Sequence, residues 1–303
     1  MKKKVVVIGG GFGGLNTVQA LKNADVEITL IDKTNHHLFQ PLLYQVATAA
    51  LSPGDIAAPI RGILSKQKNV RVLMSEAKSI DKTNRKVILN DGEVNYDYLV
   101  IATGTRHSYF GNDEWEQYAP GLKTLNDALT IREKILKSFE TAEKLSDLKE
   151  IEKYLTFVIV GGGPTGVEMA GAIAEIARKT LLKDFRNINP LMSKIILVEG
   201  YSKILSTYDE PLNDRAKRDL ESLGVSVRLN EKVTKINKLG VWIEDELVPT
   251  NNVVWAAGNT ASPLMKSLNT EIGQFGRAKV ESDCSLKNDE NVFEMTNLLI
   301  PVL

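Results

Sequence analysis

The chain has 303 residues, enough for two domains or for one large α/β domain, and its 43% hydrophobic and 25% charged residues are typical of a soluble globular protein. Lys plus Arg and Asp plus Glu number 38 each, so no overall charge attracts nucleic acid or an acidic membrane surface. The single cysteine, Cys284, and three histidines without helical ligand spacing argue against a disulfide framework and against a metal site.

The N-terminal stretch joins a short apolar run to a glycine-rich turn. Residues 5–8 are apolar, and because this run is so short it predicts a first strand of a cytoplasmic protein rather than a signal peptide. A G-x-G-x-x-G pattern follows, before a helix predicted over 15–22, with its glycines at Gly9, Gly11 and Gly14. Asp32 ends the next predicted strand, 18 positions after the last glycine (32 − 14), the spacing of a carboxylate that binds a ribose hydroxyl. The pattern predicts a dinucleotide site; a plain strand-to-helix connection is the alternative.

Residues 35–61 have no sustained apolar period, and Pro41, Pro53 and Pro59 interrupt any long element. A long irregular segment after a nucleotide fingerprint is typical of a part that folds over the ligand, or of a domain insertion. A surface loop with one short packed helix is the alternative interpretation.

Strand-like runs and one long helix follow. The runs lie within 70–89, and residues 96–104 then predict a buried strand. That strand ends in Thr-Gly, where the chain can pass close to a cofactor. Apolar residues at steps of three and four predict an amphipathic helix over 125–142, preceded by the capping-box-like sequence TLND.

The glycine fingerprint occurs a second time. An apolar run at 157–160 leads into another G-x-G-x-x-G and an apolar-periodic helix, with the glycines at Gly161, Gly163 and Gly166. Glu199 ends the next predicted strand, 33 positions after the last glycine (199 − 166), an offset that an insertion at 180–193 accounts for. An acid there accepts from both ribose hydroxyls and repels a 2′-phosphate, which favours NADH over NADPH. An unrelated surface glutamate is the alternative.

The rest of the chain repeats the plan of the first half. A helix is predicted over 211–223, and strands and hairpins follow it. Residues 252–258, NVVWAAG, predict a strand that closes on Gly258, as 96–104 closes on Thr-Gly. The predicted fold class is α/β, with two duplicated Rossmann-like dinucleotide-binding domains.

The sequence resembles the two-dinucleotide flavoprotein reductases. The resemblance lies in the two glycine fingerprints together with ATG at 102–104 and WAAG at 255–258. Four segments resemble, more narrowly, the type II NADH dehydrogenases, which are non-proton-pumping NADH:quinone oxidoreductases. These segments are FQPLLYQVATAAL, DIAAPIR, GPTGVEMAGAIAE and LLKDFRNINP. The match runs from residue 4 to about residue 293. Glutathione-reductase and sulfide:quinone relatives would need redox cysteines, which this chain lacks at a matching place.

The resemblance implies FAD and NADH as cofactors, with an FAD-binding domain over 1–112 and 259–303 interrupted by an NADH-binding domain over 113–258. The residues implied in the FAD site are Gly9, Gly11, Gly14, Asp32, Thr48, Thr103 and Gly104, with Lys33 either beside the cofactor or a solvated charge. The residues implied in the NADH site are Gly161, Gly163, Gly166, Glu199 and Gly258. Glu168 matches a family glutamate at the contact between nicotinamide and flavin, the one catalytic residue implied; a partner of the helix dipole is the alternative.

The sequence departs from the family pattern near its end. The family continues from a segment like ENVF into a Gly-Asp pair that holds the flavin's ribityl chain, then into the quinone site and amphipathic membrane helices. Here no glycine follows Gly276, and the six apolar residues 298–303 are too short to span a membrane. The pattern therefore indicates a C-terminally truncated member that lacks these segments.

The reaction implied by the resemblance is hydride transfer from NADH to the flavin and passage of two electrons to a quinone, at the cytoplasmic face of the inner membrane. Two alternatives stay open: a soluble NADH diaphorase with another acceptor, and an inactive dinucleotide-binding fragment. The sequence indicates no nucleic-acid partner and leaves open whether the chain forms a homodimer.

Overall fold

The computed structural model describes residues 1–287 and 289–295, which divide into two compact units. Unit 1 contains Met1–Leu38, Ala57–Arg106 and the chain from Asn259 on, and unit 2 contains Phe39–Ile56 and His107–Gly258. The predicted α/β fold with one dinucleotide-type domain inserted in the other is confirmed. The predicted break in the family pattern begins after Phe293, and its residues 296–303 lie outside the described residues.

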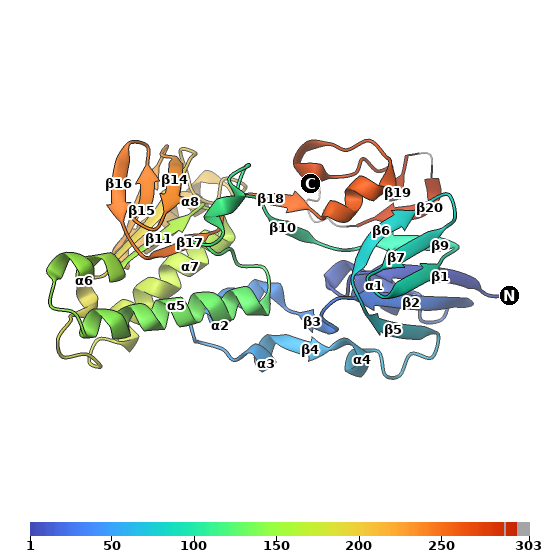
Figure 1. Ribbon diagram of the computed structural model, residues 1–303, viewed down its shortest axis with the longest axis horizontal. Coiled ribbons are helices and arrows are strands. Elements are labelled where there is room, and N and C mark those ends of the chain that lie inside the picture. Colours follow the sequence, from blue (N-terminus) through green and yellow to red (C-terminus); the bar gives the residue numbers. More distant parts are fainter. Residues whose placement is uncertain (288, 296–303) are drawn as a thin grey trace. The chain divides into compact units, whose positions relative to one another are not determined.

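Unit 1 is built on a six-stranded sheet in the order β19-β20-β9-β1-β2-β5 (Figure 1). In that order the strands are Ser285–Leu286, Asp289–Glu294, Tyr98–Ile101, Lys3–Ile8, Val26–Asp32 and Val70–Met74. β1 pairs in parallel with β2 and β9, so that Ile8 lies opposite both Ile31 and Ile101. A central parallel strand is buried on both faces and therefore needs a continuous apolar run, and residues 5–8 are all buried.

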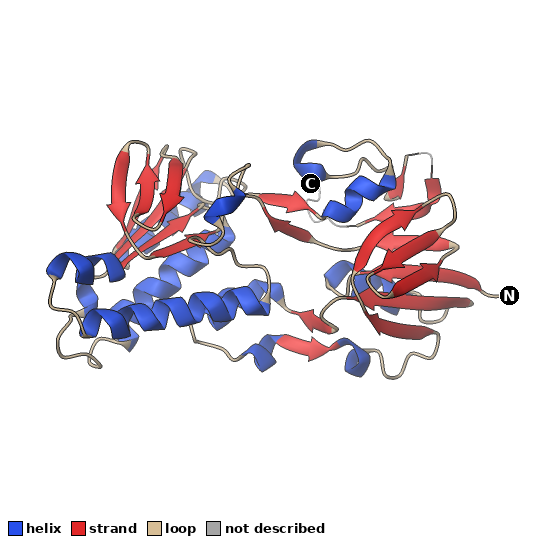
Figure 2. Cartoon of the chain, in the orientation of Figure 1, coloured by secondary structure: helices blue, strands red, loops and turns tan. Residues whose placement is uncertain are grey.

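The helix α1 (Phe12–Ala20) connects β1 to β2. It begins three residues earlier than the predicted helix over 15–22, because the turn after β1 contains only residues 9–11. The other strands of unit 1 form small sheets on this framework (Figure 2), namely β6 (Ala77–Asp81) with β7 (Lys86–Leu89) and β8 (Gly92–Asn95), and β3 (His36–Leu38) with β4 (Ala57–Pro59). The short helix α4 (Ile60–Ile63) follows β4 and buries Ile60 completely.

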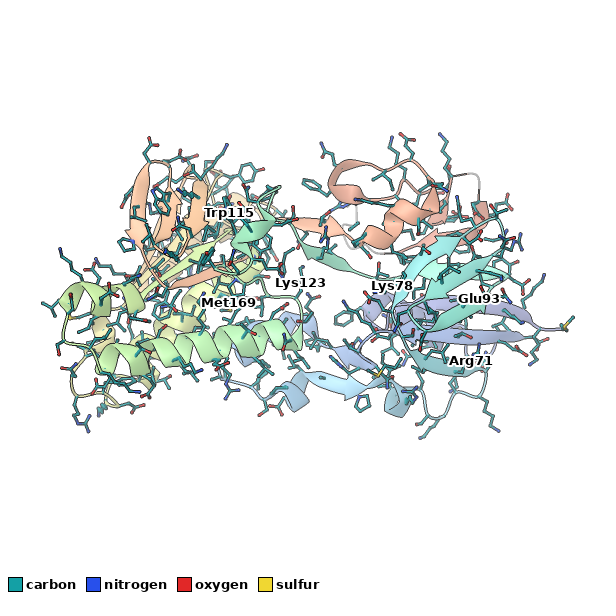
Figure 3. The ribbon with its side chains drawn as sticks, in the orientation of Figure 1. Arg71, Lys78, Glu93, Trp115, Lys123 and Met169 are labelled. Carbon is teal, nitrogen blue, oxygen red and sulfur yellow. The ribbon has the colours of Figure 1, made fainter. Side chains whose placement is uncertain are left out.

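Unit 2 is built on a parallel four-stranded sheet in the order β13-β12-β11-β17. In that order the strands are Val225–Leu229, Lys194–Glu199, Thr156–Val160 and Asn252–Trp255. Its long helices are α5 (Leu125–Glu143), α7 (Pro164–Glu175) and α8 (Glu210–Ser222). All residues of β11 are buried, and Met169 on α7 is completely enclosed within the unit (Figure 3).

The start of α5 is a complete capping box, as the sequence TLND predicted. The Thr124 hydroxyl accepts from Asp127 N at 3.1 Å, and the Asp127 carboxylate accepts from Thr124 N at 2.8 Å. The helix α6 (Leu148–Tyr154), in contrast, was not predicted. It is short and buries none of its residues, so it leaves no apolar period in the sequence.

Residues 39–56 belong to unit 2, whereas the division by sequence placed them with residues 1–112. Their helices α2 (Leu43–Ala47) and α3 (Pro53–Ile56) are short. α2 packs against α5 and α7 and buries Leu43, Val46 and Ala47. Burial of this apolar side, rather than sequence position, determines which unit the segment joins.

The remaining strands of unit 2 form an antiparallel sheet of β14 (Val233–Asn237), β15 (Gly240–Ile243) and β16 (Glu246–Pro249). This sheet corresponds to the hairpins predicted there. Two further strands, β10 (Thr105–His107) and β18 (Asn259–Ala261), pair with each other. Within residues 1–287 and 289–295, no helix combines the length and the apolar character needed to cross a membrane.

Candidate functional site

The glycine turn of unit 1 brings the backbone of β1, α1 and the end of β9 into close contact. Gly9 has φ +103°, and a Cβ there would lie 2.3 Å from the carbonyl oxygen of Ala102. A Cβ at Gly14 would lie 1.8 Å from the carbonyl oxygen of Gly9. Gly9 N donates to Ile31 O, and Ala102 N donates to Ile8 O, each at 2.8 Å. Only glycine fits at these two positions.

Unit 2 repeats this arrangement closely. Gly161 has φ +107°, and a Cβ there would lie 2.8 Å from the carbonyl carbon of Ala256. A Cβ at Gly166 would again lie 1.8 Å from the carbonyl oxygen of the first glycine of its turn. Gly161 N donates to Val198 O and Ala256 N donates to Val160 O, each at 2.8 Å. The turn and the end of β17 therefore correspond to the turn and the end of β9.

The middle glycine of each turn faces open space. A Cβ at Gly11 or at Gly163 would meet no atom of residues 1–287 and 289–295 within 4 Å. These two glycines precede α1 and α7, whose first turns contain no acidic residue and receive no side-chain cap. The N–H groups in the first turn of a helix have no partner within the helix, and the helix dipole favours an anion there. Two turns in one chain thus have the form of pyrophosphate cradles.

Each turn is tied to the acid at the end of the neighbouring strand. The Asp32 Oδ2 atom accepts from Gly10 N at 2.7 Å, while its Oδ1 atom accepts from both the backbone and the hydroxyl of Thr34 and from Asn35 N. The Glu199 Oε2 atom accepts from Gly162 N at 2.6 Å. Its Oε1 atom accepts from the following turn, at Tyr201 N.

These bonds leave different acceptor capacity on the two carboxylates. A carboxylate can accept about four hydrogen bonds, two on each oxygen. Asp32 has one crowded oxygen and one with a single donor, so Oδ2 can accept from one ribose hydroxyl. Glu199 has a single donor on each oxygen, so both oxygens can accept from ribose hydroxyls.

The end of β9 carries a polar atom without a partner. The Thr103 hydroxyl oxygen is hidden from solvent and makes no hydrogen bond within the described residues. Buried hydroxyls are normally paired, so an orphaned one beside a nucleotide turn fits a bound ligand. Gly104 follows with φ +66°, and a Cβ there would meet nothing within 4 Å.

The two other residues implied in the FAD site are Thr48 and Lys33. Thr48 ends α2 in unit 2 and donates its hydroxyl to Tyr44 O at 2.8 Å. Lys33 is exposed and, among the described residues, forms no hydrogen bond or ion pair. The contacts observed within unit 1 therefore support Asp32, Thr103 and the glycines more directly than these two.

Glu168 and Gly258 lie in unit 2. Glu168 is half-buried on α7, and burial raises the pKa of its carboxyl above the usual value. It forms no hydrogen bond or ion pair with another described residue. Gly258 follows β17 with φ +71°, and a Cβ there would lie 2.6 Å from the Phe110 ring. A carboxyl with a raised pKa on a helix that starts at such a glycine turn is a candidate for ligand contact.

Sequence reasoning missed Gly10 and Gly162. They occupy the variable position of G-x-G, yet their amides are the groups that hold Asp32 and Glu199. The offset between the glycines and the acid gave the only signal for this pairing. No group of three or more His, Cys, Asp or Glu side chains in the described ranges is placed to hold a metal ion.

A family model for pyridine nucleotide-disulphide oxidoreductases matches residues 3–295. The chain belongs to this family. Its relatives include the type II NADH:quinone oxidoreductase NdhA of Mycobacterium tuberculosis, 47% identical over 312 residues that cover 98% of this chain and 66% of the relative. Ndh of the same organism, also a type II NADH:quinone oxidoreductase, is 43% identical and is covered to 66%. The resemblance predicted from sequence is therefore confirmed, and the chain spans about two thirds of these relatives' length.

Solved structures of the family share the fold. The NDH2 of Plasmodium falciparum in complex with NADH has a TM-score of 0.90 at 24% sequence identity, covering 97% of this chain and 64% of that one. At this identity the likeness concerns the fold alone.

Proposed function

We propose that unit 1 binds FAD, that unit 2 binds NADH, and that the complete protein is an NADH:quinone oxidoreductase. One observation carries this proposal: the chain holds two glycine cradles of the same geometry, each with a carboxylate hydrogen-bonded to the loop amide. Relatives named type II NADH:quinone oxidoreductase supply the choice of donor and acceptor.

In unit 1 the residues present fit FAD. The start of α1 would hold its pyrophosphate, and the open side of Gly11 would let the phosphates approach the backbone. Asp32 would accept a ribose hydroxyl on Oδ2, and the unpaired Thr103 hydroxyl would gain a partner. When bound, FAD supplies the capacity to take a hydride from NADH and to release two electrons to a quinone.

In unit 2 the residues present fit NADH. The start of α7 and the open side of Gly163 would bind the pyrophosphate. Glu199 would accept both hydroxyls of the adenosine ribose, one on each oxygen, and would repel a 2′-phosphate. Glu168, whose pKa is raised by burial, would form a hydrogen bond to the bound NADH and so help to hold it in position.

The acceptor and the place of action extend the proposal to the complete protein. We infer that a quinone is the acceptor and that the protein contacts the cytoplasmic face of the inner membrane peripherally. A homodimer is compatible with this arrangement, and the mass of the particle in solution will decide it.

The test is NADH oxidation by the 303-residue chain reconstituted with FAD, with a short-chain quinone or a hydrophilic dye as acceptor. Saturable quinone reduction supports the proposal. Equal turnover with the dye and no saturation by quinone would instead make the chain a diaphorase. Binding of NADH without turnover would make it a dinucleotide-binding fragment.

A pair of variants serves as control. Asp32→Ala removes the carboxylate that accepts four hydrogen bonds, and we expect it to lose FAD and activity. Asp25→Ala removes an acid whose side chain is 86% exposed and should retain both. Full activity of Asp32→Ala would contradict the role given to unit 1.

A further inference from the structure

Phe110 is a large aromatic residue that the fold leaves in a costly arrangement. Its side chain is 59% exposed, and its backbone has φ +54°. A bulky residue in the left-handed region is uncommon and strained, because its Cβ crowds the following carbonyl oxygen. Such strain persists only where the surrounding structure imposes it, and it clusters at functional sites.

Hydrogen bonds and a ring contact attach the two residues before Phe110 to the end of β17. The Ser108 carbonyl accepts from Trp255 Nε1 at 2.9 Å, and Ser108 N donates to Gly258 O at 3.3 Å. Tyr109 stacks on Trp255 with ring centroids 5.1 Å apart. Ser108 and Tyr109 are therefore held along the end of β17, directly before Phe110.

The Phe110 ring covers Gly258 and forms the exposed end of an aromatic cluster. Its Cζ atom lies 2.6 Å from where a Cβ of Gly258 would be. The ring also meets Trp255 edge-to-face with centroids 6.2 Å apart. Trp115 (Figure 3) packs on Trp255 from within the unit at 5.6 Å. Trp115 and Trp255 are buried, so Phe110 is the member that presents its ring to solvent.

The topology places this ring where a ligand is expected. In the sheet order β13-β12-β11-β17, the chain runs from β11 to β12 and β13 on one side of β11. It then returns as β17 on the other side of β11. Ligands of such sheets bind outside the carboxyl ends of the strands at this switch point. Glu199 ends β12 and Gly161 follows β11, while Gly258 and Phe110 lie beyond β17. A dinucleotide with its adenosine ribose on Glu199 and its pyrophosphate at α7 therefore extends toward Phe110.

We propose that Phe110 is a positioning residue that packs its ring against the nicotinamide end of the dinucleotide. The inference rests on the proposed function of unit 2. A flat apolar ring gains most from an aromatic neighbour, and the bonds of Ser108 to Trp255 and Gly258 hold the backbone two residues before Phe110 in place. Gly258 leaves the space that the ring occupies.

The test compares NAD⁺ with ADP-ribose, which lacks the nicotinamide, by calorimetry on the full chain. Asn tolerates the left-handed conformation, so Phe110→Asn removes the ring with little effect on the backbone. We expect this variant to bind NAD⁺ about three- to tenfold more weakly and ADP-ribose as tightly as before, in line with typical aromatic pair energies. Phe110→Tyr keeps the ring and should retain both affinities.

Phe275 provides a matched control, because it is 51% exposed with φ +58° and lies in unit 1. Phe275→Asn should leave both affinities of unit 2 unchanged. Equal weakening of NAD⁺ and ADP-ribose by Phe110→Asn, or no weakening of either, would overturn the inference while leaving the NADH site in place. If the wild-type chain binds neither ligand, the proposed function of unit 2 fails and the inference fails with it.

Discussion

Adding one methyl group at two positions of the same glycine turn should separate ligand binding from folding. Gly163 has φ −73° and ψ 179°, which alanine adopts without strain, and its Cβ would meet nothing within 4 Å. We expect Gly163→Ala to change the free energy of unfolding by about 0.5 kcal/mol or less, as for an unobstructed substitution. The methyl group would stand where the pyrophosphate approaches the backbone, so NADH should bind at least about tenfold more weakly, about 1.4 kcal/mol.

Gly166→Ala should disrupt the fold itself. Its Cβ would lie 1.8 Å from the Gly161 carbonyl oxygen, and ordinary contact begins at 3.4 Å, so α7 and the turn would have to separate by about 1.6 Å (3.4 − 1.8). Overpacking of this kind costs about 3 kcal/mol or more. At the size of these units that corresponds to a melting temperature roughly 6–12 °C lower.

Tryptophan fluorescence provides the assay for both variants. The three tryptophans, Trp115, Trp242 and Trp255, all lie in unit 2, so energy transfer from them to NADH reports binding there. Thermal unfolding without ligand gives the stability in parallel. Wild-type NADH affinity in Gly163→Ala would refute the assignment of this turn to the pyrophosphate, and an unchanged melting temperature in Gly166→Ala would refute the packing argument.

Three further predictions concern charged residues of unit 2. Glu199→Ser should lower the preference for NADH over NADPH at least about tenfold, because it removes the repulsion of a 2′-phosphate; an unchanged ratio of the two dissociation constants would contradict this role. Burial lowers the pKa of Lys134 from its usual 10.5 to about 8, and among the described residues its ammonium donates only to Tyr118 O. The charged form thus destabilises the fold below about pH 8, and this penalty disappears as the pH rises toward 10.5. Wild type should therefore gain stability relative to Lys134→Met over that interval in denaturant titrations, and a constant difference between the two proteins would contradict this prediction. Glu168 has a raised pKa, so its ionised form destabilises the ligand-free fold at neutral pH. Glu168→Gln should be the more stable protein at pH 7 and lose that advantage as the pH falls through the raised pKa toward 4.5; a constant difference would count against burial as the cause.

The sequence predicted those parts of the fold that depend on local pattern. Both glycine turns, the acids at the ends of β2 and β12 and the capping box of α5 follow from short spacings that fix backbone geometry. The start of α1 at Phe12 could not be read, because Gly13 and Gly14 are poor helix formers whose place in the first turn is set by contact with Gly9.

Features that depend on packing between distant segments left no signal in the sequence. Residues 39–56 join unit 2 because α2 buries its apolar side on α5 and α7. The sequence of this segment has no apolar period from which that packing could be predicted. The amides of Gly10 and Gly162 were missed because any residue has an amide. Phe110 was missed because one aromatic residue has no pattern, and its position depends on bonds to β17.

The visible spectrum of the FAD-reconstituted chain, recorded before and after anaerobic addition of NADH, tests the central claim most directly. The claim requires both cradles to be occupied in one molecule and their ligands to react. We predict a protein-bound flavin band that NADH bleaches. In the Gly163→Ala variant, the same band should bleach only at a higher NADH concentration. A protein that retains no flavin, or a bound flavin that NADH leaves unchanged, would contradict the account.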